Sequence, residues 1–139
     1  MKKLNVIIVY TNDEEKILMC HRKKEPYKGM YNLVGGKIEE NESYIDAAYR
    51  ELNEETGIMP EDIKLVHVMD FKYQINDVEL QVYAGKLNKD VEVVDEVNKL
   101  YWFNSNENFF DTTRFAGEGN IGHMIEQIKL YRNDIFKDN

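Results

Sequence analysis

Residues 36–58 read GKIEENESYIDAAYRELNEETGI, and this stretch contains a helix with recognisable ends. Ser43 is a typical N-cap residue, because its hydroxyl can accept a hydrogen bond from the first turn. Gly57 suits the left-handed residue that follows a helix end, and Pro60 prevents the helix from continuing. The stretch therefore predicts a helix over Ser43–Thr56.

One side of the predicted helix is apolar. Its apolar residues recur at intervals of three and four positions, so they share one side of the helix. They are Ile45, Ala48, Tyr49 and Leu52. We expect this side to face the core and to leave the charged residues of the helix on another face.

Three carboxylates gather in the last turns of this helix. At about 3.6 residues per turn, Glu51, Glu54 and Glu55 share one face, where the helix dipole disfavours negative charge. A solvated acidic face is one interpretation. The other is a site for a divalent cation, because a bound ion would offset both the mutual repulsion and the dipole. Carboxylate oxygens suit Mg²⁺ (or Mn²⁺), which can polarise a phosphoanhydride bond and activate water.

The composition of the whole chain is that of one globular domain. Its 139 residues are 42% hydrophobic and 32% charged, so we expect a single domain over residues 1–139. The one cysteine, Cys20, excludes an internal disulfide and fits a reducing, cytoplasmic setting. The net charge of -8 argues against a nucleic acid polymer as partner, whereas a small phosphorylated ligand is compatible with a bound cation. No apolar run reaches membrane-spanning length.

Runs of apolar and β-branched residues predict the strands. We expect strands over Leu4–Tyr10, Lys16–Arg22, Ile63–Ile75, Val78–Leu87 and Leu100–Phe103, with a loop at Lys23–Tyr31 and a turn at Asn76-Asp77. A second helix is predicted over Ile121–Phe136, with a core-facing stripe of Ile121, Met124, Ile125, Ile128, Tyr131 and Ile135. This element order predicts the α+β class, with a mixed sheet packed against helices.

The stretch 36–58 resembles the Nudix box, G-x5-E-x7-R-E-U-x-E-E-x-G-U, where U is a bulky aliphatic residue. The matching residues are Gly36, Glu42, Arg50, Glu51, Leu52, Glu54, Glu55, Gly57 and Ile58. The resemblance implies an α/β/α sandwich with a mixed sheet between helices. It also implies hydrolysis of a nucleoside diphosphate that is linked to another group.

The same resemblance implies roles for the charged residues of the box. The glutamates Glu51, Glu54 and Glu55 are expected to bind the metal, together with the backbone carbonyl of Gly35. Arg50 is expected to orient a glutamate through a charge-assisted pair, with the remaining box glutamate, Glu42, in support.

A later carboxylate of this family often stands six residues before a tryptophan, and Glu96 stands six residues before Trp102. The resemblance implies that Glu96 binds metal or acts as the general base, for which Glu51 is the other candidate. The alternative is a solvated acidic loop, because Glu92 and Asp95 are close neighbours. Trp102 itself is expected to pack in the core.

Residues 20–39, CHRKKEPYKGMYNLVGGKIE, resemble the MutT-like branch of the family, which acts on oxidised purine nucleoside triphosphates such as 8-oxo-dGTP. By this resemblance Arg22 lies near the nucleotide and Leu33 near the base, and Lys37 is a further substrate-binding residue. Leu33 replaces an aromatic residue that is common at this position, so base stacking is not implied. Asn120 is expected either to read the oxidised base or to cap the second helix.

Functions of two classes fit these residues. The first is a Mg²⁺-dependent hydrolase of a small nucleotide, giving monophosphate and pyrophosphate, in a monomer or homodimer. ADP-ribose and dinucleoside polyphosphates are alternative substrates, although the proline often found downstream of the box in ADP-ribose hydrolases is missing after Pro60. The second class is a non-catalytic nucleotide sensor of the same fold. Retention of all three clustered glutamates favours the enzyme.

Overall fold

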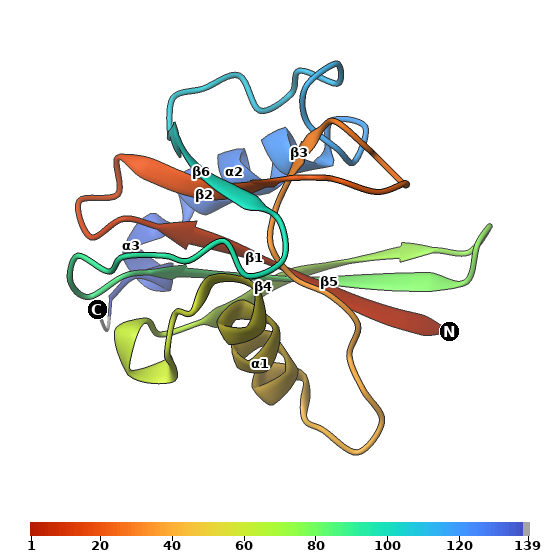
Figure 1. Ribbon diagram of the computed structural model, residues 1–139, viewed down its shortest axis with the longest axis horizontal. Coiled ribbons are helices and arrows are strands. Elements are labelled where there is room, and N and C mark those ends of the chain that lie inside the picture. Colours follow the sequence, from red (N-terminus) through yellow and green to blue (C-terminus); the bar gives the residue numbers. More distant parts are fainter. Residues whose placement is uncertain (138–139) are drawn as a thin grey trace.

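A six-stranded mixed sheet organises the chain in this computed structural model, which describes residues 1–137 (Figure 1). The strands are β1 (Lys2–Tyr10), β2 (Lys16–His21), β3 (Tyr31–Asn32), β4 (Val66–Tyr73), β5 (Val78–Lys86) and β6 (Lys99–Asn104). The order is β3-β2-β1-β5-β4, and β6 pairs with β2. β1 and β5 run parallel, whereas the other paired strands are antiparallel.

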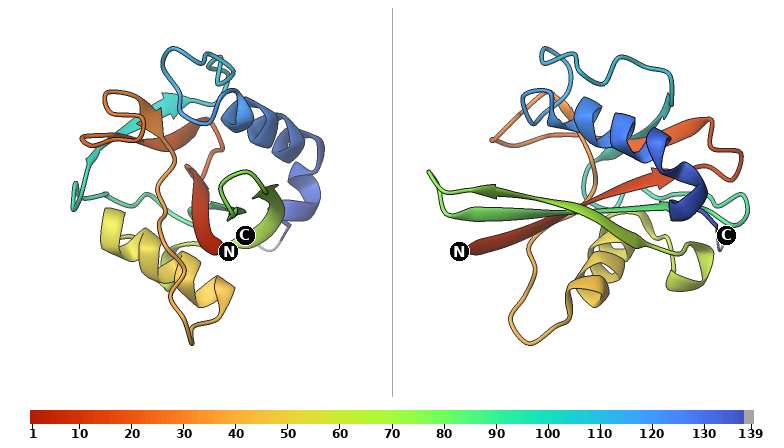
Figure 2. Two further views of the ribbon diagram at one scale, coloured as in Figure 1. Left: turned by 90° about the vertical axis from the view of Figure 1, so that its right-hand side faces the viewer. Right: turned by 180° about the vertical axis from the view of Figure 1, so that it is seen from behind.

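Helices cover both faces of the sheet, as Figure 2 shows. The helix α1 (Tyr44–Thr56) lies on one face, and α2 (Asn120–Leu130) and α3 (Arg132–Ile135) lie on the other. Strand β1 contributes side chains to the core on both faces of the sheet, because alternate residues of a strand point to opposite faces. Ile7 and Val9 join the core beneath α1, whereas Ile8 and Tyr10 join the core beneath α2. The predicted α+β sandwich is confirmed.

The predicted boundaries of α1 are confirmed. The Ser43 hydroxyl accepts a hydrogen bond from the Asp46 amide at 3.2 Å, and Gly57 takes a left-handed φ of 79°. One member of the predicted apolar stripe is wrong. Ile45 is 37% exposed, whereas Ala47 is fully buried. Tyr44, Ile45 and Asp46 are all exposed, so burial of this helix begins only at Ala47.

The C-terminal helix is not continuous over Ile121–Phe136 as predicted. The chain leaves helical geometry at Tyr131, whose φ is -116° and ψ 19°, and α3 follows as a separate turn. Tyr131 is therefore 57% exposed rather than in the core. After the break, Phe136 is buried and packs edge-on against Tyr10, with the ring centroids 5.2 Å apart. The break brings Phe136 back against strand β1.

Smaller departures affect strand ends. Tyr31 and Asn32 form β3 beside β2, although the sequence predicted a loop as far as Tyr31. β4 is shorter than the predicted Ile63–Ile75, and a short 3-10 helix, η1 (Pro60–Asp62), precedes it. Ile63 instead makes an isolated bridge to Leu87. Within residues 1–137, no helix has the length and apolar character needed to cross a membrane.

Candidate active site

Two glycines lie against β1 at the edge of the site. Asn5 holds Gly36 twice, because its backbone N–H donates to the Gly36 carbonyl at 2.8 Å and its side-chain Oδ1 accepts from the Gly36 backbone N–H at 3.0 Å. Gly35 has a φ of 147°, and a Cβ there would lie 2.1 Å from the Asn5 carbonyl oxygen. Only glycine fits this approach. The backbone of this segment is thereby fixed next to the C-terminal half of α1.

The carboxylate of Glu55 contacts this glycine segment. Its Oε2 accepts a hydrogen bond from the Gly35 amide at 2.6 Å. Burial raises the pKa of Glu55 to about 7, and the Gly35 hydrogen bond offsets only part of that effect. The nearby charge of Glu51 adds to the rise. A half-buried carboxylate that accepts from backbone and adjoins other carboxylates suits the binding of a cation.

Glu51 lies beside the second glycine. A Cβ at Gly36 would be 2.4 Å from Glu51 Oε2, so the carboxylate occupies the space that a side chain would need. Burial is the main cause that raises the pKa of Glu51. The two more buried glutamates of α1 thus each adjoin one glycine of the segment.

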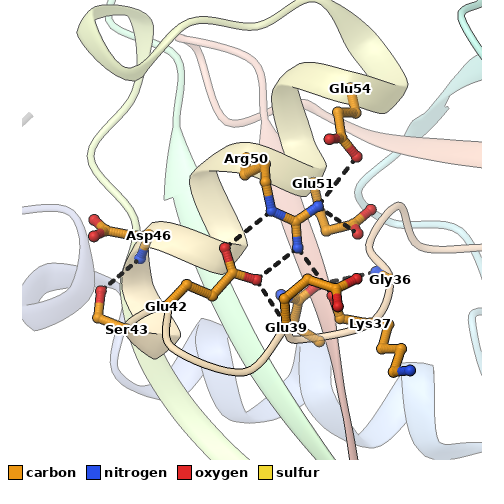
Figure 3. A network of polar contacts seen from close by, with 10 residues as sticks. Gly36, Lys37, Glu39, Glu42, Ser43, Asp46, Arg50, Glu51 and Glu54 are labelled. Atoms are coloured by element: carbon orange, nitrogen blue, oxygen red, sulfur yellow. Dashed lines mark hydrogen bonds and ion pairs between the residues drawn. The ribbon is translucent and has the colours of Figure 1, made fainter.

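Arg50 joins the carboxylates of Glu42, Glu51 and Glu54 into one network (Figure 3). Its Nε and Nη2 bind Glu42 at 3.0 and 2.7 Å, and its Nη1 binds Glu51 at 3.0 Å and Glu54 at 3.2 Å. Nη2 also donates to the Lys37 carbonyl at 3.0 Å. These bonds, led by Arg50, lower the pKa of Glu42 to about 2. The expected pairing of Arg50 with glutamates is therefore present.

The donor groups fit a hard divalent cation in their chemistry. Glu51, Glu54 and Glu55 offer carboxylate oxygens, and burial raises the pKa of two of them, Glu51 and Glu55. In the described part of the chain, however, no three acidic, histidine or cysteine side chains already converge as a metal site. Glu51 and Glu54 are turned to Arg50 and Glu55 to Gly35. These contacts would have to open for the oxygens to meet on one ion.

A cavity of about 800 Å³ adjoins the glycine segment. The residues that line it include Arg22, Tyr27, Asn32, Leu33, Gly35, Gly36, Glu55, Tyr73, Glu118 and Asn120. Three of the four residues expected at the substrate therefore share one cavity with Glu55. The fourth, Lys37, is exposed and does not line it, and lies instead in a second hollow with Lys2 and Lys3.

Several residues of the cavity were not anticipated from the sequence. The Tyr27 hydroxyl binds both oxygens of Glu118, at 2.9 and 2.8 Å, and so joins two loops at the cavity. Asn32 accepts from the Leu33 amide through Oδ1, so its Nδ2 end is turned elsewhere. Tyr27 and Glu118 are 91 positions apart, and neither stands in a periodic pattern. The positive backbone φ of both residues also has no sequence signature here, since neither is glycine.

The geometry separates the two interpretations of Asn120. The N-cap of α2 is Gly119, in a left-handed conformation, and no side chain caps this helix end. Asn120 is the first helical residue, and its Nδ2 donates to the Tyr73 hydroxyl. The capping interpretation is therefore wrong, and the amide is left at the cavity.

Glu96 lies apart from the cavity. It is exposed, in a loop that packs on the C-terminal end of α1, where the Val94 amide donates to the Thr56 carbonyl at 2.9 Å. Its neighbour Asp95 accepts from the Leu100 amide at 3.0 Å. Trp102 packs against the core beneath α1 as expected. The loop thus borders the glutamate-bearing end of α1, with the Glu96 side chain in solvent.

Comparison with known proteins agrees with this geometry. A family profile described as "NUDIX domain" matches residues 1–123. The chain is 31% identical over 94 residues to the ADP-ribose pyrophosphatase of Methanocaldococcus jannaschii. This alignment covers 59% of this chain and 56% of that protein. It is 32% identical over 63 residues to the 8-oxo-dGDP phosphatase NUDT18 of Mus musculus, covering 45% of this chain and 20% of that protein. The matched part of the chain thus spans 56% of the first relative's length and only 20% of the second's.

A solved structure gives the same fold. A C. elegans Ap4A hydrolase in a binary complex superimposes with a TM-score of 0.77 at 15% identity, covering 96% of this chain and 99% of that one. At this identity the likeness is one of fold alone. The sheet with helices on both faces is therefore the common element.

Proposed function

The chain belongs to the NUDIX domain family, and from this premise we propose that it hydrolyses a phosphoanhydride bond in a nucleotide, with Mg²⁺ or Mn²⁺ as cofactor. The proposed substrate is an oxidised purine nucleoside triphosphate of the 8-oxo-dGTP kind, and the products are the monophosphate and pyrophosphate. One domain over residues 1–139 would carry the activity, in a cytoplasmic monomer or homodimer. The substrate is a free nucleotide rather than a polymer.

The observation that carries this proposal is the shared cavity. Arg22, Leu33 and Asn120 line it together with Glu55 and the glycine segment. A nucleotide that places its base against Asn120 would bring its phosphates towards the carboxylates of α1. The exposed Glu118 carboxylate at the Asn120 end supports this orientation, because it would repel phosphate there.

The reaction divides among the side chains as follows. Water attacks phosphorus, the bridging P–O bond breaks, and pyrophosphate leaves with the bonding electrons. A bound divalent cation would supply charge neutralisation of the phosphates and activation of the water. The proton lost by water passes to a carboxylate, for which Glu51 and Glu96 are the candidates. Glu51 is half-buried beside Gly36 and has a raised pKa, both of which favour proton acceptance, whereas Glu96 is in solvent.

A substrate panel tests the proposal. We expect 8-oxo-dGTP to give the highest kcat/KM with Mg²⁺, and the products to be 8-oxo-dGMP and pyrophosphate. ADP-ribose is the second candidate, because the relative from M. jannaschii bears that activity in its name and because about 800 Å³ accommodates more than a mononucleotide. A higher kcat/KM for ADP-ribose than for 8-oxo-dGTP would replace the first candidate by the second. Tight nucleotide binding without multiple turnover would identify a sensor instead.

A further inference from the structure

We propose that Tyr73 is a positioning residue, whose hydroxyl fixes which end of the Asn120 amide faces the cavity and so sets the choice between purine nucleotides. The inference rests on the proposed function, because it concerns how that substrate is selected. Tyr73 is at the last position of β4 and lines the same cavity as Asn120. Its hydroxyl accepts a hydrogen bond from Asn120 Nδ2.

The Tyr73 ring is held by a second contact between the same two elements. Phe71 and Tyr73 are two positions apart on β4 and share a face, with centroids 6.5 Å apart and planes inclined by 18°. Asn120 and His123 are three positions apart on α2 and also share a face. Phe71 meets the His123 ring at 6.2 Å, edge to face. The Tyr73–Asn120 bond is therefore one of two adjacent contacts that fix strand and helix relative to each other.

The structure gives the direction of this hydrogen bond, with Asn120 Nδ2 as the donor and the Tyr73 hydroxyl as the acceptor. A tyrosine hydroxyl can donate or accept, so by itself it would satisfy either end of an asparagine amide. Glu118 lies close enough to contribute to the raised pKa of Tyr73, after the larger effect of burial. Both Glu118 oxygens accept from the Tyr27 hydroxyl, so the Tyr73 hydroxyl is left to accept from Asn120. The Nδ2 end is then the end that faces Tyr73.

The consequence for a ligand follows from the remaining end of the amide. With Nδ2 engaged by Tyr73, Oδ1 is free as an acceptor. An 8-oxopurine carries a hydrogen on N7 and can donate to such an acceptor, whereas N7 of an unmodified purine is itself an acceptor. Without the Tyr73 hydroxyl the amide could turn over and present Nδ2 to an unmodified N7. The hydroxyl thus disfavours the ordinary nucleotide.

The test compares Tyr73→Phe with the parent protein on 8-oxo-dGTP and dGTP. We expect the ratio of the two kcat/KM values to fall about three- to tenfold, in line with the loss of one hydrogen bond, mainly through KM and with kcat for 8-oxo-dGTP nearly unchanged. Dissociation constants of 8-oxo-dGMP and dGMP, measured by calorimetry, should converge by the same factor. Tyr83→Phe is the matched control, because it also loses one hydroxyl contact, to Gln81 at 2.8 Å, outside the cavity. Its ratio should equal that of the parent.

The outcomes separate this inference from the function on which it rests. A parent protein that prefers 8-oxo-dGTP, with an unchanged ratio in Tyr73→Phe, overturns the role of Tyr73 and leaves the proposed function standing. A parent with metal-dependent turnover and equal kcat/KM for both nucleotides overturns both. If the ratio falls equally in Tyr83→Phe, the effect comes from an unspecific loss of rigidity, and the role of Tyr73 is also rejected. Thermal unfolding of both variants verifies that they are folded at the assay temperature.

Discussion

The Arg50 guanidinium and the Glu42 carboxylate meet at two points, with Nη2 2.7 Å from Oε1 and Nε 3.0 Å from Oε2. This geometry requires the planar fork of arginine. Arg50→Lys keeps the positive charge and loses the paired contact, so we expect kcat to fall about ten- to a hundredfold, as for other residues that orient metal ligands. Steady-state kinetics measure the effect. If the lysine variant keeps the kcat of the parent protein, only the positive charge of Arg50 matters and the two-point contact does not.

Metal dependence follows from the clustered carboxylates of α1. Activity should disappear in excess chelator and return with Mg²⁺ or Mn²⁺, whereas Ca²⁺ should bind with much weaker turnover because its coordination is looser. Pyrophosphate release from one nucleotide under the three conditions measures this. Full activity in excess chelator contradicts the proposed chemistry.

Glu54→Gln removes one carboxylate charge and keeps the size of the side chain. We expect kcat to fall at least about a hundredfold and the fold to persist, because the Glu54 side chain is 56% exposed. Glu92→Gln is a suitable control, since Glu92 is exposed and does not line the cavity. Equal turnover of the two variants would exclude Glu54 from the site.

The two glycines beside β1 should respond differently to alanine. At Gly36 the added Cβ meets the flexible tip of Glu51, so we expect a loss of kcat of about a hundredfold with little change in thermal stability. At Gly35 it meets the Asn5 backbone, and the φ of 147° is unfavourable as well, so unfolding should become easier by about 2 kcal/mol or more. Denaturant unfolding and kinetics on both variants distinguish these effects. Equal stability losses would argue against a special role for the Gly36–Glu51 contact.

Asn120→Ala should lower the ratio of kcat/KM for 8-oxo-dGTP to that for dGTP about ten- to a hundredfold. The reason is that a polar group of the oxidised base that loses its partner weakens the binding of that nucleotide. Its free energy of unfolding should fall by no more than about 1 kcal/mol, because only the bond to Tyr73 is lost and Gly119, not Asn120, occupies the N-cap. Kinetics on both nucleotides, with thermal unfolding in parallel, measure the two effects. A loss of thermal stability with an unchanged nucleotide preference would mean that Asn120 has a structural role only.

Local sequence was sufficient for the parts of the site that lie within one element. The ends of α1 follow from Ser43 and Gly57, and the grouping of its glutamates follows from helical periodicity. The break at Tyr131 was not predictable, because the apolar spacing continues through it and the contact of Phe136 with Tyr10 joins positions far apart in the sequence. The bond between Tyr27 and Glu118 likewise joins positions without a common pattern. Contacts between distant segments, rather than propensities, determine these features.

The parallel pairing of β1 with β5 has a consequence for the order of assembly on the ribosome. The paired positions are 76 apart at both ends of the ladder, Lys2 with Val78 and Tyr10 with Lys86. During synthesis β1 therefore emerges long before its central partner, together with the glycine segment and α1. Long-range pairing of this kind is slow to form, because a large loop must close first. Until β5 is released, the antiparallel strand β2 is the neighbour available to shield the apolar run of β1 from other nascent chains.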